Sequence, residues 1–255
     1  MKRVATALVL IPVLTWLILA GPQWAFVAVV AAVGLAVFYE FDQIVAAHRF
    51  ARAGIPGMAA GLALLLAPDP EIVVVLGGLL GLVLAMRIRE VSNVLPGAAS
   101  FVLGIVYIFG AWRCALALRG IGPHWLMFAL LLSWAGDTAA LYIGRAFGRH
   151  KLAPNVSPGK TWEGAIGSVA GGIVAGAIYA HYLLSAAPLG IVVLFAATGN
   201  IAGQLGDLAE SALKRGAGVK DSGSSLPGHG GWLDRVDSSL FAIPVVYGLL
   251  KLFPQ

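Results

Sequence analysis

Residues 94–112 read VLPGAASFVLGIVYIFGAW, which is nineteen consecutive residues without a charged side chain. A helix rises about 1.5 Å per residue, so a run of this length approaches the roughly 30 Å thickness of the hydrocarbon core of a bilayer. Charge returns directly afterwards, at Arg113. The stretch therefore predicts a membrane-spanning helix.

The whole chain has the composition of a membrane protein. Of its 255 residues, 59% are hydrophobic and 11% are charged, whereas a soluble domain carries about 25% charged residues. The net charge of +5 comes from short basic clusters between apolar runs, so we expect no nucleic-acid partner. The one cysteine, Cys114, excludes an internal disulfide and a cysteine-rich zinc site.

Apolar runs recur along the chain and predict an all-α fold, a polytopic helical membrane protein with about nine transmembrane helices. The expected spans are 4–20, 23–39, 54–68, 71–86, 94–117, 124–144, 164–184, 187–206 and 238–254. Met1-Lys2-Arg3 before the first run also resembles a secretory signal peptide. With so many spans behind it, a first span that stays in place is the simpler interpretation.

Lysine and arginine are shared unevenly between the two sides that nine spans create. Fourteen of the 17 fall on the side of the N-terminus, and only Arg113, Arg119 and Lys251 fall on the other. Because cytoplasmic loops are enriched in positive charge, we predict a cytoplasmic N-terminus and an external C-terminus. The composition, rich in Ala, Gly, Leu and Val, favours a bacterial inner (cell) membrane.

Two predicted cytoplasmic loops, 145–163 and 207–237, hold much of the charge. The helix that leads into the second loop has a polar stripe on one face, formed by Asn200, Gln204, Asp207, Ser211 and Lys214. Polar groups inside a bilayer are costly unless they face a cavity or a partner. We therefore favour a phosphate and metal site over a helix-end salt bridge followed by a solvated loop.

Several residues in and near these loops have both a functional and a structural interpretation. Asp137 is ionisable near the end of a span, which favours function, although a pair with Arg145 two turns away is the alternative. His229 lies between glycines and near Asp234, and the sequence leaves its catalytic or structural role open. We expect Lys214 and Arg215, at a helix end, to be exposed and to serve phosphate binding rather than folding.

Two local patterns resemble known motifs but do not indicate a nucleotide-binding loop or a ligand site of their own. The sequence Pro158-Gly159-Lys160-Thr161 ends like a nucleotide-binding P-loop, but Pro154 stands where that loop needs a glycine and no strand is expected before it. Lys160 is then a lone phosphate contact or a topology charge. Gly167, Gly171 and Ala175 have the small-xxx-small spacing that indicates close packing of helices.

The second loop carries a specific resemblance. Residues 211–237 read SALKRGAGVKDSGSSLPGHGGWLDRVD and resemble the signature of phosphatidate cytidylyltransferases, with Trp232 where that family usually has an aliphatic residue. Residues 134–148 (WAGDTAALYIGRAFG) and 157–164 (SPGKTWEG) are similar to further motifs of the family. The resemblance covers the chain from about residue 134 onward, and the first 120 residues match only as apolar spans.

The resemblance implies an enzyme that transfers the CMP moiety of CTP to phosphatidic acid, giving CDP-diacylglycerol and pyrophosphate for phospholipid biosynthesis. It implies Mg²⁺ or another divalent cation as cofactor, and CTP, phosphatidic acid and the lipid bilayer as partners, with the active site on the cytoplasmic side. A homodimer remains open. We expect residues 1–120 to form about five N-terminal spans and residues 121–255 to form the catalytic transmembrane region.

Residue types within and directly next to the matching motifs suggest three groups of site residues. The expected catalytic residues are Asp137, Lys214, Arg215, Lys220, Asp221, His229 and Arg235. The expected substrate-binding residues are Arg145, Lys160, Ser211, Gly230 and Gly231. The expected metal ligands are Asp207, Asp234 and Asp237, with Asp207 and Asp234 as the first choice.

Two other functions are alternatives to this one. A CTP-using polyprenol kinase would transfer the γ-phosphoryl group, but the uninterrupted signature argues against it. A secondary transporter would line its path with Asp137 and Asn200, yet the chain shows no paired repeats and its polar residues gather on one side.

Overall fold

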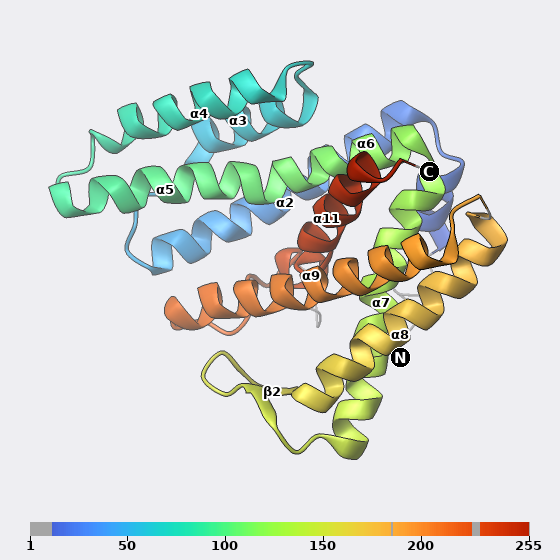
Figure 1. Ribbon diagram of the computed structural model, residues 1–255. Coiled ribbons are helices and arrows are strands. Elements are labelled where there is room, and N and C mark those ends of the chain that lie inside the picture. The colour runs from blue at the N-terminus through green and yellow to red at the C-terminus, as the bar shows by residue number, and fades with distance from the viewer. Residues whose placement is uncertain (1–11, 185, 226–229, 255) are drawn as a thin grey trace. The chain divides into compact units, whose positions relative to one another are not determined.

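The computed structural model describes residues 12–184, 186–225 and 230–254, and this part of the chain is helical apart from one two-stranded hairpin (Figure 1). The predicted helical membrane architecture is confirmed at that level. Five of the described helical segments are long and apolar enough to cross a membrane. They are α2 (Gln23–Ala47), the segment Val91–Ile121, α7 (Pro123–Phe147), α8 (Trp162–Leu183) and α9 (Leu189–Gly216).

Residues 94–112 lie within the segment Val91–Ile121, which is not a uniform α-helix. It consists of η1 (Val91–Asn93), α5 (Val94–Gly104), a π-helical turn η2 (Ile105–Gly110) and α6 (Ala111–Ile121). The π turn carries Phe109, which is fully buried. A Cβ atom at Gly61 would lie 2.1 Å from its ring, so only glycine permits this contact.

Three further predicted spans are helical but short. They correspond to α3 (Gly54–Leu66), α4 (Pro70–Ala85) and α11 (Ser239–Leu252), of 13, 16 and 14 residues. The predicted first span lies partly outside the described residues, of which 12–19 are helical. The count of nine spans and the orientation of both termini therefore stay predictions.

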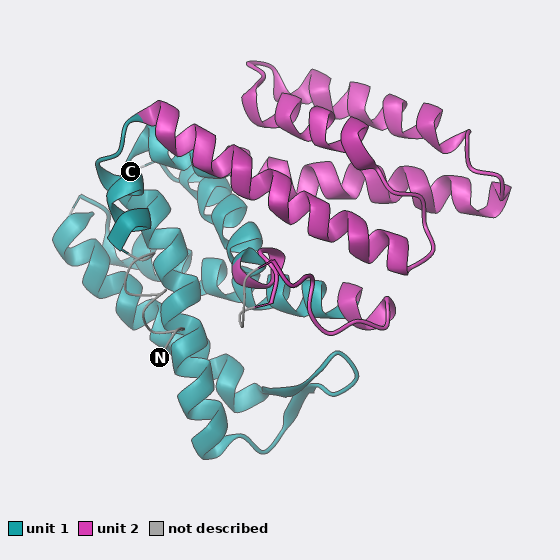
Figure 2. Cartoon of the chain, turned by 180° about the vertical axis from the view of Figure 1, so that it is seen from behind, with its two compact units in different colours: residues 1–22, 114–212, 236–255 teal, residues 23–113, 213–235 magenta. Residues whose placement is uncertain are grey.

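The chain forms two compact units (Figure 2). Unit 1 comprises residues 1–22, 114–212 and 236–255, and unit 2 comprises residues 23–113 and 213–235, so the signature loop belongs with the N-terminal helices. In unit 1, α7 and α8 pack closely: a Cβ atom at Gly167 would lie 2.5 Å from Ile143, and one at Gly171 would lie 2.5 Å from Ala139. The predicted role of this small-residue spacing in helix packing is confirmed.

Two of the three basic residues on the predicted external side cap helices. In unit 2, the Arg113 guanidinium donates to the carbonyls of Leu64, Leu65 and Pro68 at the end of α3, at 3.1–3.3 Å. In unit 1, Arg119 donates to the carbonyls of Ile18 and Leu17 at 2.8 and 3.2 Å. The last carbonyls of a helix lack intrahelical partners, so both arginines have a structural use that is independent of topology.

Candidate active site

A pocket in unit 1 is lined by residues of α7, α8, α9 and the hairpin of strands β1 (Lys151–Ala153) and β2 (Ser157–Thr161). Its volume is about 380 Å³. Four charged side chains line it: Asp137 and Arg145 from α7, Lys160 from β2, and Asp207 from α9. All four are predicted site residues. Asp137, Arg145 and Lys160 belong to the two upstream motifs, and Asp207 lies just before the signature.

The hairpin places Lys160 at this pocket. The strands are antiparallel, with Lys151 opposite Thr161 and Ala153 opposite Ser157. Thr161 ends β2 and caps α8, because its Oγ1 accepts a hydrogen bond from the amide of Gly164 at 3.2 Å. The expectation that no strand precedes this sequence is wrong, because β1 lies before it. Residues 157–161 themselves form a strand that ends in a helix cap, and Pro154 still stands where a P-loop needs glycine.

Glu163 fastens the other end of the hairpin. Its carboxylate accepts hydrogen bonds from the amide of Arg149 at 3.1 Å and from the amide of His150 at 3.3 Å. The Nδ1 atom of His150 lies 2.6 Å from Glu163 Oε1. The start of the hairpin is therefore tied to the first turn of α8, which limits the positions open to Lys160.

The charges of the pocket are partly paired. Lys160 Nζ lies 2.6 Å from Asp207 Oδ2, and these side chains are 24% and 32% exposed. Asp137 and Arg145 are exposed, and the described structure holds no ion pair between them. The alternative interpretation of Asp137 as the partner of Arg145 is thus not what the structure shows.

The inner part of the polar stripe on α9 is structural. Asn200 is buried, donates to the carbonyl of Leu132 at 3.0 Å, and accepts from Ser168 at 3.2 Å and from Gln204 at 2.8 Å. A Cβ atom at Gly136 would lie 2.0 Å from the Asn200 amide nitrogen. The stripe therefore divides into Asn200, whose hydrogen bonds hold helices together, and Gln204 and Asp207, which line the pocket further along α9.

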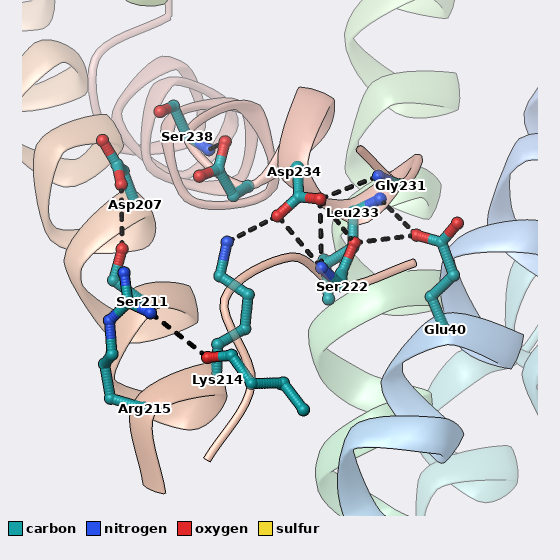
Figure 3. Close-up of polar contacts among 12 residues, drawn as sticks. Glu40, Asp207, Ser211, Lys214, Arg215, Ser222, Gly231, Leu233, Asp234 and Ser238 are labelled. Carbon is teal, nitrogen blue, oxygen red and sulfur yellow. Dashed lines mark hydrogen bonds and ion pairs between the residues drawn. The ribbon is translucent and has the colours of Figure 1, made fainter. Parts of the chain in front are cut away.

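In unit 2 the signature loop is organised around a buried ion pair (Figure 3). Lys214 Nζ lies 2.5 Å from Asp234 Oδ1, and both side chains are 10% exposed. Asp234 also accepts hydrogen bonds from the amide of Ser222 at 3.0 Å and from the amide of Gly231 at 2.8 Å. Lys214 is buried, not exposed as we had expected, because the loop folds back over the end of α9.

Sequence reasoning missed Glu40 on α2, which lies against the same loop (Figure 3). Its side chain is 2% exposed and accepts hydrogen bonds from the hydroxyls of Ser222 and Ser225 and from the amide of Leu233. An ionisable residue at the end of an apolar span is a functional candidate. This rule led to the prediction that Asp137 is a site residue. The same rule would also have marked Glu40 as a site residue.

The other predicted site residues occupy varied positions. Arg215, Lys220, Asp221 and Arg235 are exposed. Ser211 donates to Asp207 at 3.4 Å, and Asp237 accepts from the amide of Ser238 at 2.8 Å. Gly230 has a φ of +76°, a conformation that favours glycine, and His229 lies outside the described residues.

The protein supplies only some of the ligands that a divalent cation would need in this pocket. Among the described residues, no three His, Cys, Asp or Glu side chains gather where they could hold a metal ion. Asp137 and Asp207 nevertheless line one pocket. Magnesium commonly takes one or two carboxylates together with substrate phosphates, so this pair suits a cation that arrives with, or is completed by, a phosphate ligand.

Comparison with known proteins identifies the family to which the chain belongs. The model of the cytidylyltransferase family matches residues 1–253. The chain belongs to the cytidylyltransferase family. The family resemblance read from the signature is confirmed, and the match also includes the N-terminal helices, which the motifs alone did not reach.

Individual relatives within the cytidylyltransferase family agree. The chain is 37% identical over 262 aligned positions to the phosphatidate cytidylyltransferase of Brucella suis, covering 99% of this chain and 94% of the relative. It is 40% identical over 156 positions to that of Bacillus subtilis, covering 59% and 57%. It is 47% identical over 128 positions to that of Haemophilus influenzae, covering 48% and 44%.

Proposed function

We infer that the protein is a nucleotidyltransferase that transfers the CMP moiety of CTP to phosphatidic acid, giving CDP-diacylglycerol and pyrophosphate. The observation that carries this inference is the similarity over 99% of the chain to a relative named phosphatidate cytidylyltransferase. The pocket of unit 1 supports it, because its basic and acidic side chains suit phosphates and a divalent cation.

The reaction requires little covalent chemistry from the protein. A phosphate oxygen of phosphatidic acid forms a bond to the α-phosphorus of CTP, and the bond from that phosphorus to the bridging oxygen breaks. The electron pair leaves with pyrophosphate. Because a phosphate monoester has a second pKa near 6, the attacking oxygen is already largely ionised at neutral pH. The protein's work is to bring two polyanions together in line and to stabilise the leaving group.

We assign this work in unit 1 to the charged residues of the pocket. Arg145 and Lys160 bind phosphate oxygens, and Lys160 is held in place by its ion pair with Asp207. Asp137 and Asp207 are the residues that would hold Mg²⁺, which when bound neutralises phosphate charge and stabilises the leaving pyrophosphate. Asp137 belongs to a motif that resembles one of the phosphatidate cytidylyltransferases, and Asp207 lies four residues before the signature 211–237.

In unit 2 we assign the signature loop to substrate phosphates. Arg215, Lys220 and Arg235 provide exposed positive charge, and Asp221 lies beside Lys220 in the sequence. Asp234 holds Lys214 and the turn at Gly231, so its role includes shaping the loop. We retain Asp234 and Asp237 as candidate metal ligands with lower priority than Asp207, because Asp234 already accepts several hydrogen bonds.

We further propose that the protein lies in a bacterial inner membrane with these loops on the cytoplasmic side. CTP is cytosolic and the phosphatidate headgroup lies at the interface, so that side brings both substrates to the same loops. The excess of basic residues on the predicted cytoplasmic side supports this placement. A homodimer remains an open alternative to a monomer.

The direct test uses the purified full chain in vesicles that contain phosphatidic acid, with magnesium and CTP labelled at either the α- or the γ-phosphate. We expect α-label in the lipid and γ-label in pyrophosphate. Label from the γ-phosphate in the lipid, with CDP released, would indicate a kinase instead. If no nucleotide-dependent lipid product forms, the proposal is rejected and a transporter becomes the leading alternative.

Two arginines of one region provide a matched pair of variants. Arg145 lines the pocket, whereas Arg149, four residues further on and also exposed, does not. We expect Arg145→Ala to lower the formation of CDP-diacylglycerol by about tenfold or more, the loss typical of a charged hydrogen bond to phosphate. Arg149→Ala should keep nearly full activity, and equal losses in both variants would reject the assigned pocket.

A further inference from the structure

We infer that Glu40 is a positioning residue for the cytidylyl transfer, acting through the signature loop on Lys214. The inference rests on the proposed function and assigns a role to a residue that lies outside every motif of the signature. Glu40 belongs to α2, in the N-terminal part of the chain, about 180 residues before the loop that it contacts.

The loop is bound to Glu40 at three places. Oε2 of Glu40 accepts from Ser222 Oγ at 3.0 Å and from the amide of Leu233 at 2.9 Å. Oε1 accepts from Ser225 Oγ at 2.8 Å. One buried carboxylate thus holds both the start and the end of the segment 222–233. Hydrogen bonds to a charged group are stronger than neutral ones, so Glu40 holds Ser222, Ser225 and Leu233 in place.

The contact explains two glycines of the signature. A Cβ atom at Gly231 would lie 2.3 Å from Glu40 Oε2, and one at Gly223 would lie 2.9 Å from Glu40 Oε1. Both distances are too short for a side chain to fit without moving the carboxylate. A Cβ atom at Gly231 would also lie 2.2 Å from Ser222 Oγ. Glycine at these positions therefore lets the loop close directly on Glu40 and Ser222 (Figure 3).

A chain of contacts leads from Glu40 to a predicted catalytic residue. Ser222 Oγ lies 3.0 Å from Glu40 Oε2 and also 3.0 Å from Asp234 Oδ2. A hydroxyl has a single proton to donate, so Ser222 serves one carboxylate at a time. Asp234 in turn holds Lys214 at 2.5 Å. Loss of Glu40 would therefore loosen the groups that set the position of the Lys214 ammonium.

Asp42 provides a matched control on the same helix. It is also a buried carboxylate, 5% exposed, and accepts from the amides of Ala53 and Gly54 at 2.7 and 3.1 Å. These bonds hold the start of α3 and involve no residue of the signature loop. Loss of Asp42 would remove a comparable number of charged hydrogen bonds without touching the loop.

The test compares Glu40→Ala, Glu40→Gln and Asp42→Ala in the full chain, with activity expressed per folded protein. We expect Glu40→Ala to lower turnover by at least about tenfold, because charged hydrogen bonds to the loop are lost. Glu40→Gln should recover part of that loss, because its amide can accept from Leu233 and donate to Ser225. Asp42→Ala should lower the melting temperature but keep turnover within about twofold.

Hydrogen exchange gives a second measurement that does not depend on activity. Amides in the segments 219–225 and 230–235 should exchange faster in Glu40→Ala than in the native protein, and at the native rate in Asp42→Ala. If Glu40→Ala does not fold, Ser225→Ala removes a single contact of Glu40 and should speed exchange in the same segments with a smaller loss of turnover.

Two outcomes would overturn the inference. The first is native turnover and native exchange in Glu40→Ala. The second is equal loss of turnover in Glu40→Ala and Asp42→Ala, which would indicate a general effect on folding. If the native protein makes no CDP-diacylglycerol in the same vesicles, the proposed function fails instead, and the exchange measurement still decides whether Glu40 holds the loop.

Discussion

In unit 2, Nζ of Lys214 lies 2.5 Å from Oδ1 of Asp234, and each side chain is only 10% exposed. The two residues stand twenty positions apart and close the signature loop over the end of α9. A buried ion pair loses much of its Coulombic gain to desolvation, but removing one partner leaves an uncompensated charge. Lys214 therefore contributes to folding as well as to any phosphate binding.

The first prediction separates these two contributions. We expect Lys214→Met to lower the free energy of unfolding by about 3–5 kcal/mol, because Asp234 is then a buried, unpaired carboxylate. The double variant Lys214→Met with Asp234→Leu should recover much of that stability, since neither charge remains. Neither variant should form CDP-diacylglycerol at a measurable rate. Thermal unfolding in detergent and the lipid product assay measure the two effects independently.

Lys220→Ala is the stability control for this experiment, because Lys220 belongs to the same loop but is exposed. Its melting temperature should equal that of the native protein. If Lys214→Met melts at the native temperature as well, the buried pair is not a stabilising feature of the loop.

The second prediction concerns the packing of α7 against α9 in unit 1. A Cβ atom at Gly136 would lie 2.0 Å from the Asn200 side-chain nitrogen and 2.7 Å from Ser168 Oγ. We expect Gly136→Ala to destabilise the protein by about 1–3 kcal/mol, the usual cost of overpacking. Gly248→Ala on α11 is the control, because nothing lies within 4 Å of the added methyl group. Equal melting temperatures for the two variants would contradict the prediction.

The helical membrane architecture could be predicted because apolar runs of bilayer length record it directly. The π turn at Ile105–Gly110 could not, because no local pattern marks it; its Phe109 packs against Gly61, which is far away in the sequence. The hairpin at 151–161 was likewise missed, since its strands are short and polar and are held by Glu163 through contacts that no local pattern reveals.

The residues of the candidate site could be predicted from the sequence, but the contacts between them could not. Asp137, Arg145, Lys160 and Asp207 were all expected, and the structure brings them to one pocket. The burial of Lys214 was not expected, because a lysine at a helix end is usually exposed and the fold of the loop that covers it is tertiary information. Glu40 could not be predicted from the motifs, because it lies outside them and its contacts with the signature loop are tertiary.

The third prediction tests the topology. With fourteen basic residues on one side and three on the other, we expect the N-terminus in the cytoplasm and the C-terminus outside. A reporter fused after residue 255 should be active only in the external compartment. A cytoplasmic signal would show that one span is miscounted, and the 13-residue helix α3, in the predicted span 54–68, is the first to re-examine.

The last prediction concerns the divalent cation. Asp137 and Asp207 line one pocket, and we propose that both contact the cation together with substrate phosphates. Asp137→Asn and Asp207→Asn should each raise the Mg²⁺ concentration needed for half-maximal activity by at least about tenfold, because even residues behind metal ligands change metal affinity by 10- to 100-fold. A magnesium titration of the lipid product assay measures this directly.

Two variants sharpen the interpretation of that titration. Asp69→Asn removes an exposed carboxylate before α4, outside the pocket, and should leave the magnesium requirement unchanged. Asp234→Asn should lower the melting temperature by weakening the pair with Lys214, with little change in the magnesium requirement of the protein that remains folded. If instead Asp234→Asn shifts the magnesium requirement and Asp207→Asn does not, the cation belongs to the signature loop, and the assignment of Asp207 as its first ligand is wrong.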